Sequence, residues 1–145
     1  MASARKILIA DDDANDVIFL TRALEKCGIE HSIDSVRDGE AAIEYLKSKP
    51  NPDLVFLDLK MPKVDGFEVL DWLGGRGKLR CIPVVVLSSS ALEEDKSKAL
   101  ELGAREYRVK PQDFEGLRKM AVEICKHWLG EQGVNAFPAR ENTSR

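Results

Sequence analysis

The chain of 145 residues is long enough for one domain with one hydrophobic core. Hydrophobic residues make up 43% and charged residues 32%, which excludes a globally disordered chain, and no apolar run approaches the roughly 18 residues that a membrane span requires. The formal net charge of −3 gives no reason to expect a nucleic acid as partner, because nucleic-acid-binding surfaces are basic.

Short apolar runs alternate with longer amphipathic stretches as far as residue 130. Apolar runs favour strands, whereas apolar residues three or four positions apart favour helices. In chain order, the pattern predicts a strand at 6–10, a helix at 15–28, a strand at 31–36, a helix at 38–49, a strand at 53–58, a helix at 66–75, a strand at 83–88, a helix at 91–103, a strand at 105–109 and a helix at 114–130. Five strand–helix units in succession predict a parallel sheet with helices on both faces.

Several elements carry more specific signals. The strand at 31–36 alternates in polarity and is expected at an edge of the sheet, whereas the continuous apolar strands are expected in its centre. Gly28 is a natural helix stop and Asp38 a plausible helix cap. The helix at 91–103 has few apolar residues, so we expect it to be weakly anchored. The last helix has an apolar stripe made of Leu117, Met120, Ala121, Ile124 and Trp128.

The organisation indicates one domain over residues 1–130 and a flexible C-terminal tail over 131–145, which lacks periodicity. The three cysteines, Cys27, Cys81 and Cys125, are odd in number and far apart in sequence, with neither a zinc spacing nor a disulfide framework. We expect three reduced thiols that fill space. This expectation and the absence of a signal peptide favour a cytoplasmic protein.

Polar residues follow four of the five predicted strands. Asp11–Asp13 follow the first strand, Asp58 ends the third, Ser88 ends the fourth, and Lys110–Pro111 follow the fifth. Ligands bind beyond the carboxyl ends of the strands in open parallel sheets, so these side chains are expected to converge. Crowded carboxylates repel one another unless a hard cation such as Mg²⁺ takes their oxygens as ligands. With a lysine beside it, such a site suits a phosphoryl group, and a carboxylate can accept one covalently.

Each of these residues also has a simpler explanation. Asp13 fits a helix N-cap, and Asp58, Ser88 and Lys110, each taken singly, fit a turn residue, a cap and a solvated side chain. Their joint occurrence at successive strand ends favours the functional interpretation.

The sequence resembles the response-regulator receiver domains of two-component signalling over roughly residues 5–130. The resemblance rests on "ILIADDD", "DLVFLDLKMPKVDGFEVL", "VVVLSSS" and "YRVKP". It implies a flavodoxin-like, doubly wound α/β fold of five βα units, (βα)5, with the strand order 2-1-3-4-5. The extension after the last helix and the "HWL" ending resemble single-domain regulators that are paired with bacterial phytochrome kinases.

The resemblance also implies residue roles. It places the phosphoacceptor at Asp58, the switch hydroxyl at Ser88, the phosphoryl-binding lysine at Lys110 and the switch aromatic at Tyr107, although Tyr107 also fits an ordinary strand aromatic. A cis bond is implied between Lys110 and Pro111. The implied Mg²⁺ ligands are Asp11, Asp12, Asp58 and the backbone carbonyl of Lys60.

The function expected from this resemblance is that of a stand-alone phosphoacceptor rather than an enzyme. A sensor histidine kinase, of phytochrome type by the closer resemblance, would phosphorylate Asp58. The face formed by helix 91–103, strand 105–109 and helix 114–130 would then change and signal by protein contact, including contact with a second copy. Three alternatives are an intermediate carrier in a phosphorelay, a phosphatase of the haloacid-dehalogenase type and a flavodoxin-like cofactor binder. The phosphatase would need an acid where Lys60 stands, and the cofactor binder a phosphate loop where "DDD" stands.

Overall fold

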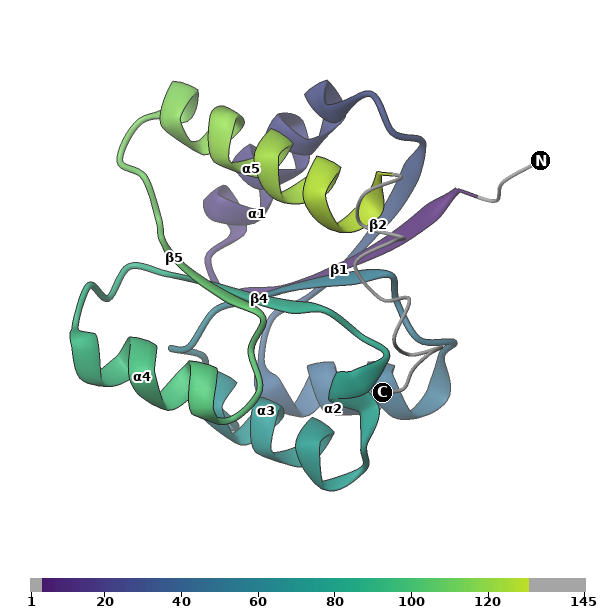
Figure 1. The fold of residues 1–145 in the computed structure, drawn as a ribbon, viewed down its shortest axis with the longest axis vertical. Helices are drawn as coiled ribbons and strands as arrows, with labels where there is room; N and C mark the ends of the chain where they lie inside the picture. Colours follow the sequence, from purple (N-terminus) through teal and green to yellow (C-terminus); the bar gives the residue numbers. More distant parts are fainter. Residues whose placement is uncertain (1–3, 131–145) are drawn as a thin grey trace.

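The computed structural model describes residues 4–130. Strands and helices alternate as the sequence predicts (Figure 1). In chain order the elements are β1 (Arg5–Ala10), α1 (Ala14–Leu24), the 3₁₀ helix η1 (Glu25–Cys27), β2 (His31–Val36), α2 (Gly39–Ser48), β3 (Leu54–Leu57), α3 (Gly66–Gly75), the 3₁₀ helix η2 (Lys78–Arg80), β4 (Val84–Ser88), α4 (Glu93–Glu101), β5 (Glu106–Val109) and α5 (Phe114–Leu129). No helix among these residues is long and apolar enough to cross a membrane.

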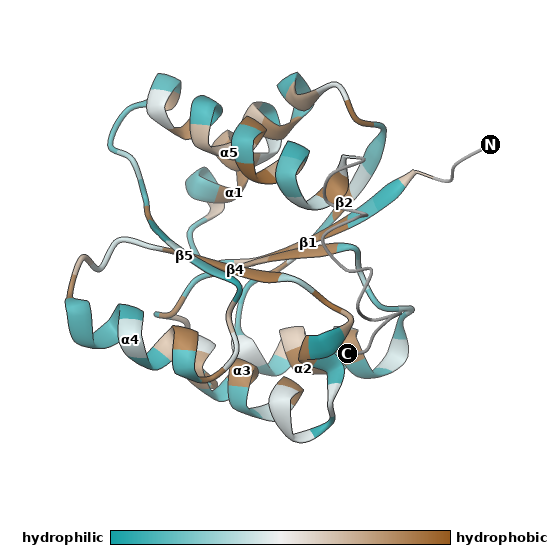
Figure 2. Cartoon of the chain, viewed as in Figure 1, coloured by the Kyte–Doolittle hydropathy of each residue, from teal (hydrophilic) through white to brown (hydrophobic). Residues whose placement is uncertain are grey.

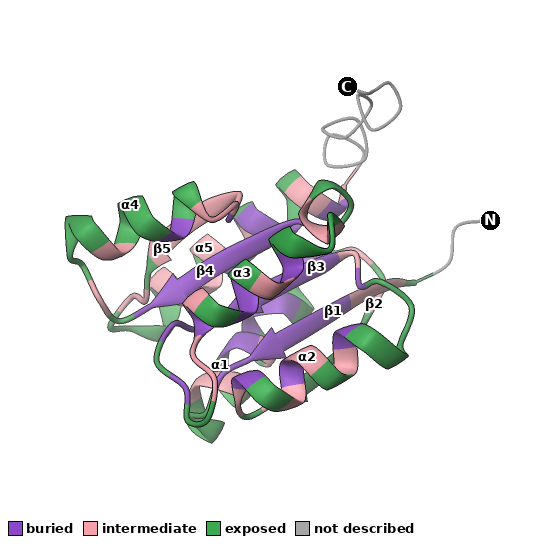
Figure 3. Ribbon diagram, turned by 90° about the horizontal axis from the view of Figure 1, so that it is seen from below, coloured by how far each residue is buried: buried purple, intermediate pink, exposed green. Residues whose placement is uncertain are grey.

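The five strands form one parallel sheet in the order β2-β1-β3-β4-β5, as predicted. All residues of β3 and β4 are buried, which explains their uninterrupted apolar sequences (Figure 3). β2 lies at an edge and none of its residues is fully buried, which explains its alternating polarity. The paired register aligns the carboxyl ends of β1, β3 and β4, with Ala10 opposite Leu57 and Leu57 opposite Val86.

Helices cover both faces of the sheet. α1 and α5 lie on one face, and α2, α3 and α4 lie on the other (Figure 1). Each face has its own apolar cluster, and the central strands send alternate side chains into the two: Ile7 and Phe56 belong to the α1–α5 side, Leu8 and Val55 to the other. Figure 2 shows the apolar residues concentrated on the strands and on the inner sides of the helices.

Side-chain caps fix the helix starts that follow the strands. Asp13, Asp38 and Asp113 each accept a backbone hydrogen bond at the start of their helix, and Asp65 forms a capping box with Glu68. The predicted helix at 15–28 is in fact two segments, because α1 gives way to η1 after Leu24. Gly28 then ends this segment with a left-handed φ of 78°, the stop that the sequence predicts.

α4 and α5 differ in how firmly they are anchored. α4 is shorter than predicted and has Ala99 as its single buried residue, in agreement with its polar sequence. α5 buries Ala121 and Ile124 from the predicted stripe, while the other three members of the stripe are partly buried; Cys125 and Leu129, which the stripe omitted, are buried as well. The tail expected over 131–145 lies outside the described residues.

Candidate functional site

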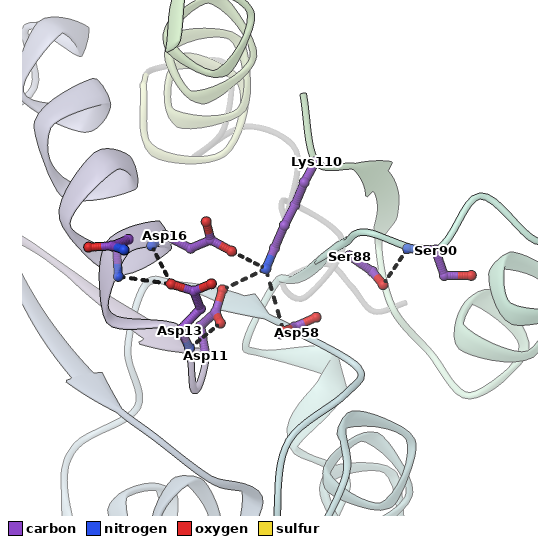
Figure 4. A network of polar contacts seen from close by, with 8 residues as sticks. Asp11, Asp13, Asp16, Asp58, Ser88, Ser90 and Lys110 are labelled. Atoms are coloured by element: carbon purple, nitrogen blue, oxygen red, sulfur yellow. Dashed lines mark hydrogen bonds and ion pairs between the residues drawn. The ribbon is translucent and has the colours of Figure 1, made fainter. Parts of the chain in front are cut away.

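The polar residues at the strand ends converge at one edge of the sheet (Figure 4). Asp11 follows β1, Asp58 follows β3, Ser88 is the last residue of β4, and Lys110 follows β5. The sheet hydrogen bonding continues into the site, because the amide of Asp58 donates to the carbonyl of Ala10 at 2.9 Å and the amide of Lys110 to the carbonyl of Ser88 at 2.8 Å. These backbone hydrogen bonds fix the positions of the Cα atoms from which the Asp58 and Lys110 side chains extend into the site.

Three carboxylates form a compact cluster. Asp11, Asp12 and Asp58 can each place one oxygen so that all three lie within 4.8 Å of one another. Asp11 and Asp58 are buried, whereas Asp12 is exposed. The backbone amide of Asp13 donates to Asp11 at 2.9 Å, which fixes the Asp11 carboxylate. An oxygen-rich set of this kind is what Mg²⁺ and similar hard divalent cations require, so the cluster fits a divalent metal.

Lys110 is the cation of the site (Figure 4). Its Nζ donates to an Oδ2 atom of Asp16 at 2.7 Å, of Asp11 at 2.9 Å and of Asp58 at 3.4 Å. Burial alone would lower the pKa of Lys110, but the hydrogen bonds to Asp16 and Asp11 outweigh burial and raise this pKa above its ordinary value. Lys110 therefore stays protonated and offsets part of the carboxylate charge.

Burial raises the pKa of both inner carboxylates. The pKa of Asp58 rises from 3.8 to about 6, because burial and the neighbouring Asp11 outweigh the opposite effect of Lys110 and of the Leu59 amide. Burial likewise raises the pKa of Asp11, against the Asp13 amide and Lys110. Burial thus destabilises the ionised forms of these carboxylates more than Lys110 stabilises them. A further cation beside the cluster would stabilise the ionised forms.

Asp16 is the site residue that the sequence analysis missed. It lies in the first turn of α1, three residues after the end of the "DDD" motif, and accepts the shortest hydrogen bond that Lys110 donates. Asp13, by contrast, is the N-cap predicted from sequence, since it accepts the amides of Asn15 and Asp16. The sequence carried one signal for Asp16, because it stands three positions after the N-cap Asp13, in the first turn of the helix that starts at the site.

The hydroxyl of Ser88 is hydrogen-bonded to the β4–α4 loop in this structure. Ser88 is fully buried, and its Oγ accepts the amide of Ser90 at 3.1 Å. The carbonyl of Ser90 accepts a hydrogen bond from the Tyr107 hydroxyl at 2.8 Å, and the Ser90 hydroxyl donates to Asp95 at 2.6 Å. One residue of the β4–α4 loop therefore contacts Ser88, Tyr107 and the first turn of α4. This role of Ser90 was not predicted from the sequence.

The loop after β3 passes close to the backbone of the site. Gly66 approaches so closely that a Cβ at this position would lie 2.4 Å from the carbonyl oxygen of Asp58, so only glycine fits here. Lys60, expected to offer its carbonyl to a metal, is an exposed residue of this loop.

One expectation was wrong. The Lys110–Pro111 bond is trans, since no cis peptide bond occurs among the described residues. The two isomers of an X–Pro bond differ little in energy, so the local sequence does not decide between them. With the trans bond, Lys110 still reaches Asp11, Asp16 and Asp58.

Comparisons with known proteins identify relatives of this chain among response regulators. The chain is 39% identical over 129 residues to the probable methanogenesis regulatory protein FilR2 of Methanothrix harundinacea, covering 86% of this chain and 83% of that protein. The solved structure of the phosphorylated cyanobacterial phytochrome response regulator RcpA matches with a TM-score of 0.82 at 34% identity, covering 88% of this chain and 95% of that one. The Mn²⁺-bound form of response regulator Rcp1, a protein known from Synechocystis, matches with a TM-score of 0.80, also at 34% identity, covering 88% and 96%.

A family model covers most of the chain. The response regulator receiver domain matches residues 7–122, which run from β1 into α5 and include all the strand-end residues described above. The observed strand order and the acidic cluster at the carboxyl edge are consistent with that match. This chain therefore belongs to the response regulator receiver domain family of two-component signalling.

Proposed function

We propose that Asp58 accepts a phosphoryl group from a phosphohistidine of a sensor histidine kinase. The observation that carries the proposal is the convergence of charge on Asp58. Its buried carboxylate lies within 4.8 Å of ligand oxygens of Asp11 and Asp12, and 3.4 Å from the ammonium of Lys110. A carboxylate held in this way combines a fixed nucleophilic oxygen with a nearby positive charge that can bind a phosphoryl oxygen.

Asp11, Asp12, Asp58 and the backbone carbonyl of Lys60 are the proposed ligands of a Mg²⁺ ion. Burial, with a smaller contribution from a neighbouring carboxylate, raises the pKa of Asp11 and Asp58, and a divalent cation would favour their charged forms, which supports this assignment. When bound, Mg²⁺ supplies the positive charge that offsets the charge of the phosphoryl oxygens. The Mn²⁺-bound form of the related Rcp1 is further support.

The transfer itself requires one exchange of bonds. An Oδ atom of Asp58 attacks the phosphorus, the bond from phosphorus to the histidine nitrogen breaks, and the histidine keeps that electron pair. Lys110 is placed to pair with a phosphoryl oxygen, at the cost of contacts that it now makes with Asp11 and Asp16. The residues proposed to carry this chemistry are therefore Asp58, Lys110 and, for a second phosphoryl oxygen, Ser88.

The signal would leave the site through Ser88 and Tyr107. If Ser88 Oγ turns toward the phosphoryl group, it gives up the hydrogen bond from the Ser90 amide. The hydroxyl of Tyr107 donates a hydrogen bond to the carbonyl of the same Ser90, so the position of the Tyr107 side chain depends on this loop. α4 begins shortly after the loop and buries one residue, which supports its role as the movable element of an α4–β5–α5 output face.

The proposed partners are proteins. A phytochrome-type sensor kinase is the proposed phosphodonor, because RcpA and Rcp1 are related regulators and the solved RcpA is named as a phytochrome regulator. Output by protein contact, including a homodimer through the α4–β5–α5 face, is proposed together with a cytoplasmic location and no role for nucleic acid or membrane. We propose a signalling phosphoacceptor with no enzymatic activity toward other molecules. The proposed receiver domain spans residues 1–130.

The direct test is phosphorylation by acetyl phosphate with Mg²⁺, read by intact mass. We expect one acid-labile phosphoryl group on the wild-type chain and none on Asp58→Asn. Asp71→Asn, an equal charge change at an exposed position of α3, is the matched control and should label normally. Equal labelling of Asp58→Asn and wild type would refute the assignment. Incubation of the labelled chain with histidine phosphotransfer proteins then separates a terminal regulator, which retains its phosphoryl group, from a phosphorelay carrier, which passes it on.

A further inference from the structure

Two of the three cysteines meet in the core between η1 and α5. The Sγ atoms of Cys27 and Cys125 are 2.7 Å apart, although the two residues are 98 positions apart in sequence. Both side chains are buried, with 3% of Cys27 and none of Cys125 exposed. Cys81 is exposed and lies apart from this pair, after η2. The sequence analysis predicted space-filling thiols and gave no reason to expect this contact.

The surroundings of the pair do not favour a metal site. A structural zinc ion needs four ligands, and two thiols provide half of them. Within the part of the chain that the structure describes, the acidic cluster at the sheet edge is the one group of three metal-ligating side chains. Cys27 and Cys125 belong to the same buried apolar cluster as Leu24, Ile124 and Leu129. Cys27 Sγ also donates to the carbonyl of Ile29 at 3.9 Å, and Cys125 donates to Cys27, so the two sulfurs are the one redox-active pair in this part of the core.

We propose that Cys27 and Cys125 form an oxidisable dithiol that a peroxide converts into a disulfide joining η1 to α5. In the first step a thiolate attacks one oxygen of hydrogen peroxide, the O–O bond breaks, and a sulfenic acid and hydroxide form. In the second step the other sulfur attacks the sulfenic sulfur and the S–O bond breaks, again releasing hydroxide. The two thiol protons convert both hydroxides to water, and the two electrons lost by the sulfurs reduce the peroxide.

Burial makes the first step slow and the contact makes the second step fast. A peroxide cannot reach either sulfur in the closed structure, and burial raises the pKa of the Cys125 thiol, which disfavours its thiolate. Cys27 is the accessible end of the pair, because it ends a three-residue 3₁₀ helix whose Glu25 and Lys26 are exposed. Opening of η1 would expose Cys27 alone, and its closure would return the oxidised sulfur to Cys125.

The disulfide would link the end of the α1–η1 segment to the C-terminal half of α5. A cross-link between residues this far apart in sequence restricts the unfolded chain strongly, so the oxidised protein should unfold at a higher urea concentration. It would also prevent η1 from separating from α5. The proposal is independent of the chemistry at Asp58, because the two sulfurs lie in the core cluster and not among the strand-end residues.

The test uses the full chain with Cys81→Ser, which removes the exposed thiol. The protein is treated with hydrogen peroxide, denatured, and its thiols are counted with Ellman's reagent. We expect the loss of both thiols, a mass lower by two hydrogen atoms, a tryptic peptide linking Cys27 to Cys125, and reversal by dithiothreitol. The urea midpoint of the oxidised protein should exceed that of the reduced protein. Urea below the unfolding transition should accelerate thiol loss, because it favours opening of η1.

Clear outcomes would overturn the proposal. Both thiols surviving under conditions that oxidise Cys81 in the wild-type chain would show that the pair is inert. A mass increase from added oxygen, without a linked peptide, would show oxidation of separate thiols. A second chain with both Cys27→Ser and Cys81→Ser should show neither the mass loss nor the shift in midpoint. The thiol count on the Cys81→Ser chain decides the question even if this second variant does not fold.

Discussion

At the scale of single residues, the site is an unequal balance between one ammonium and several carboxylates. Lys110 contacts Asp11, Asp16 and Asp58, so its charge is shared among three partners. The pKa of Asp58 nevertheless rises to about 6, because burial destabilises the ionised carboxylate more than Lys110 stabilises it. The chemistry proposed for Asp58 therefore comes at the expense of stability, as is common for desolvated functional groups.

Replacement of Asp58 by asparagine should stabilise the metal-free protein at pH 7.5. The folded-state pKa of about 6 exceeds the ordinary 3.8, so the fold binds this proton more tightly than the unfolded chain does. Ionised Asp58 therefore lowers stability fully above pH 6, and this cost disappears as the pH falls through 6 toward 4. We expect Asp58→Asn to gain about 1–3 kcal/mol in urea unfolding at pH 7.5 and to lose the advantage near pH 4.

The control is Asp71→Asn, which should change the free energy of unfolding by less than about 0.5 kcal/mol at either pH, because Asp71 is exposed. A destabilised Asp58→Asn at pH 7.5 would contradict the account of the site as desolvated and crowded. Saturating Mg²⁺ should reduce the difference, since it stabilises the wild-type cluster more than the variant cluster.

Removal of the lysine should separate metal binding from phosphorylation. Lys110→Ala leaves Asp11, Asp16 and Asp58 without their shared ammonium, which makes the cluster more negative. We expect Mg²⁺ affinity, measured by calorimetry, to stay equal or increase, while the rate of labelling by acetyl phosphate falls at least about tenfold. Lys47→Ala, at a half-exposed position on α2, should change neither quantity. Parallel losses of both would instead indicate collapse of the site.

At the scale of elements, the sequence predicts what depends on local pattern and misses what depends on packing. The bounds of β2 and α3 agree with those predicted, because polarity period and turn residues mark them locally. The change from α1 to η1, the trans Lys110–Pro111 bond and the contact of Asp16 with Lys110 were not predicted. The Asp16–Lys110 contact joins segments distant in sequence and η1 packs on α5, which no local pattern contains, and the two isomers of an X–Pro bond differ too little in energy for local sequence to decide.

The β4–α4 loop is the clearest element whose role emerged from the structure. The amide, the carbonyl and the hydroxyl of Ser90 bond to Ser88, Tyr107 and Asp95, respectively, and the Ser90 hydroxyl also accepts the amide of Leu92. α4 has no side-chain cap at its N-cap residue Leu92, and the Ser90–Asp95 hydrogen bond instead links its first turn to the preceding loop. This pair ties the start of α4 to the residues proposed to switch.

Loss of the Ser90–Asp95 hydrogen bond should loosen α4. We expect Ser90→Ala and Asp95→Ala each to lower the free energy of unfolding by about 0.5–1.5 kcal/mol and to speed amide hydrogen exchange in the first turn of α4. The matched control is Ser97→Ala, an exposed serine on the same helix. Unchanged exchange in the first two variants would mean that the bond does not hold the helix start.

At the scale of the whole molecule, the two faces of the sheet are anchored unequally. On one face α1 and α5 pack on each other and bury several large side chains, among them Leu24 and Ile124. On the other face α4 contributes Ala99 alone as a buried residue. The sheet thus joins a firmly packed layer to a layer with one weakly held helix. The strand-end site lies between the two layers and contacts residues at the start of α1 and in the loop before α4.

The charge of the strand-end edge has a consequence for the order in which ligands arrive. Asp11, Asp12, Asp13, Asp16 and Asp58 together with Lys110 carry a formal charge of −4, against −3 for the whole chain, so the remainder of the chain carries +1 in sum. The electrostatic field of the protein therefore points to this edge, where it attracts cations and repels anionic phosphodonors. A divalent cation should arrive first, at a rate that falls as ionic strength rises, and its arrival should open the way for the phosphodonor.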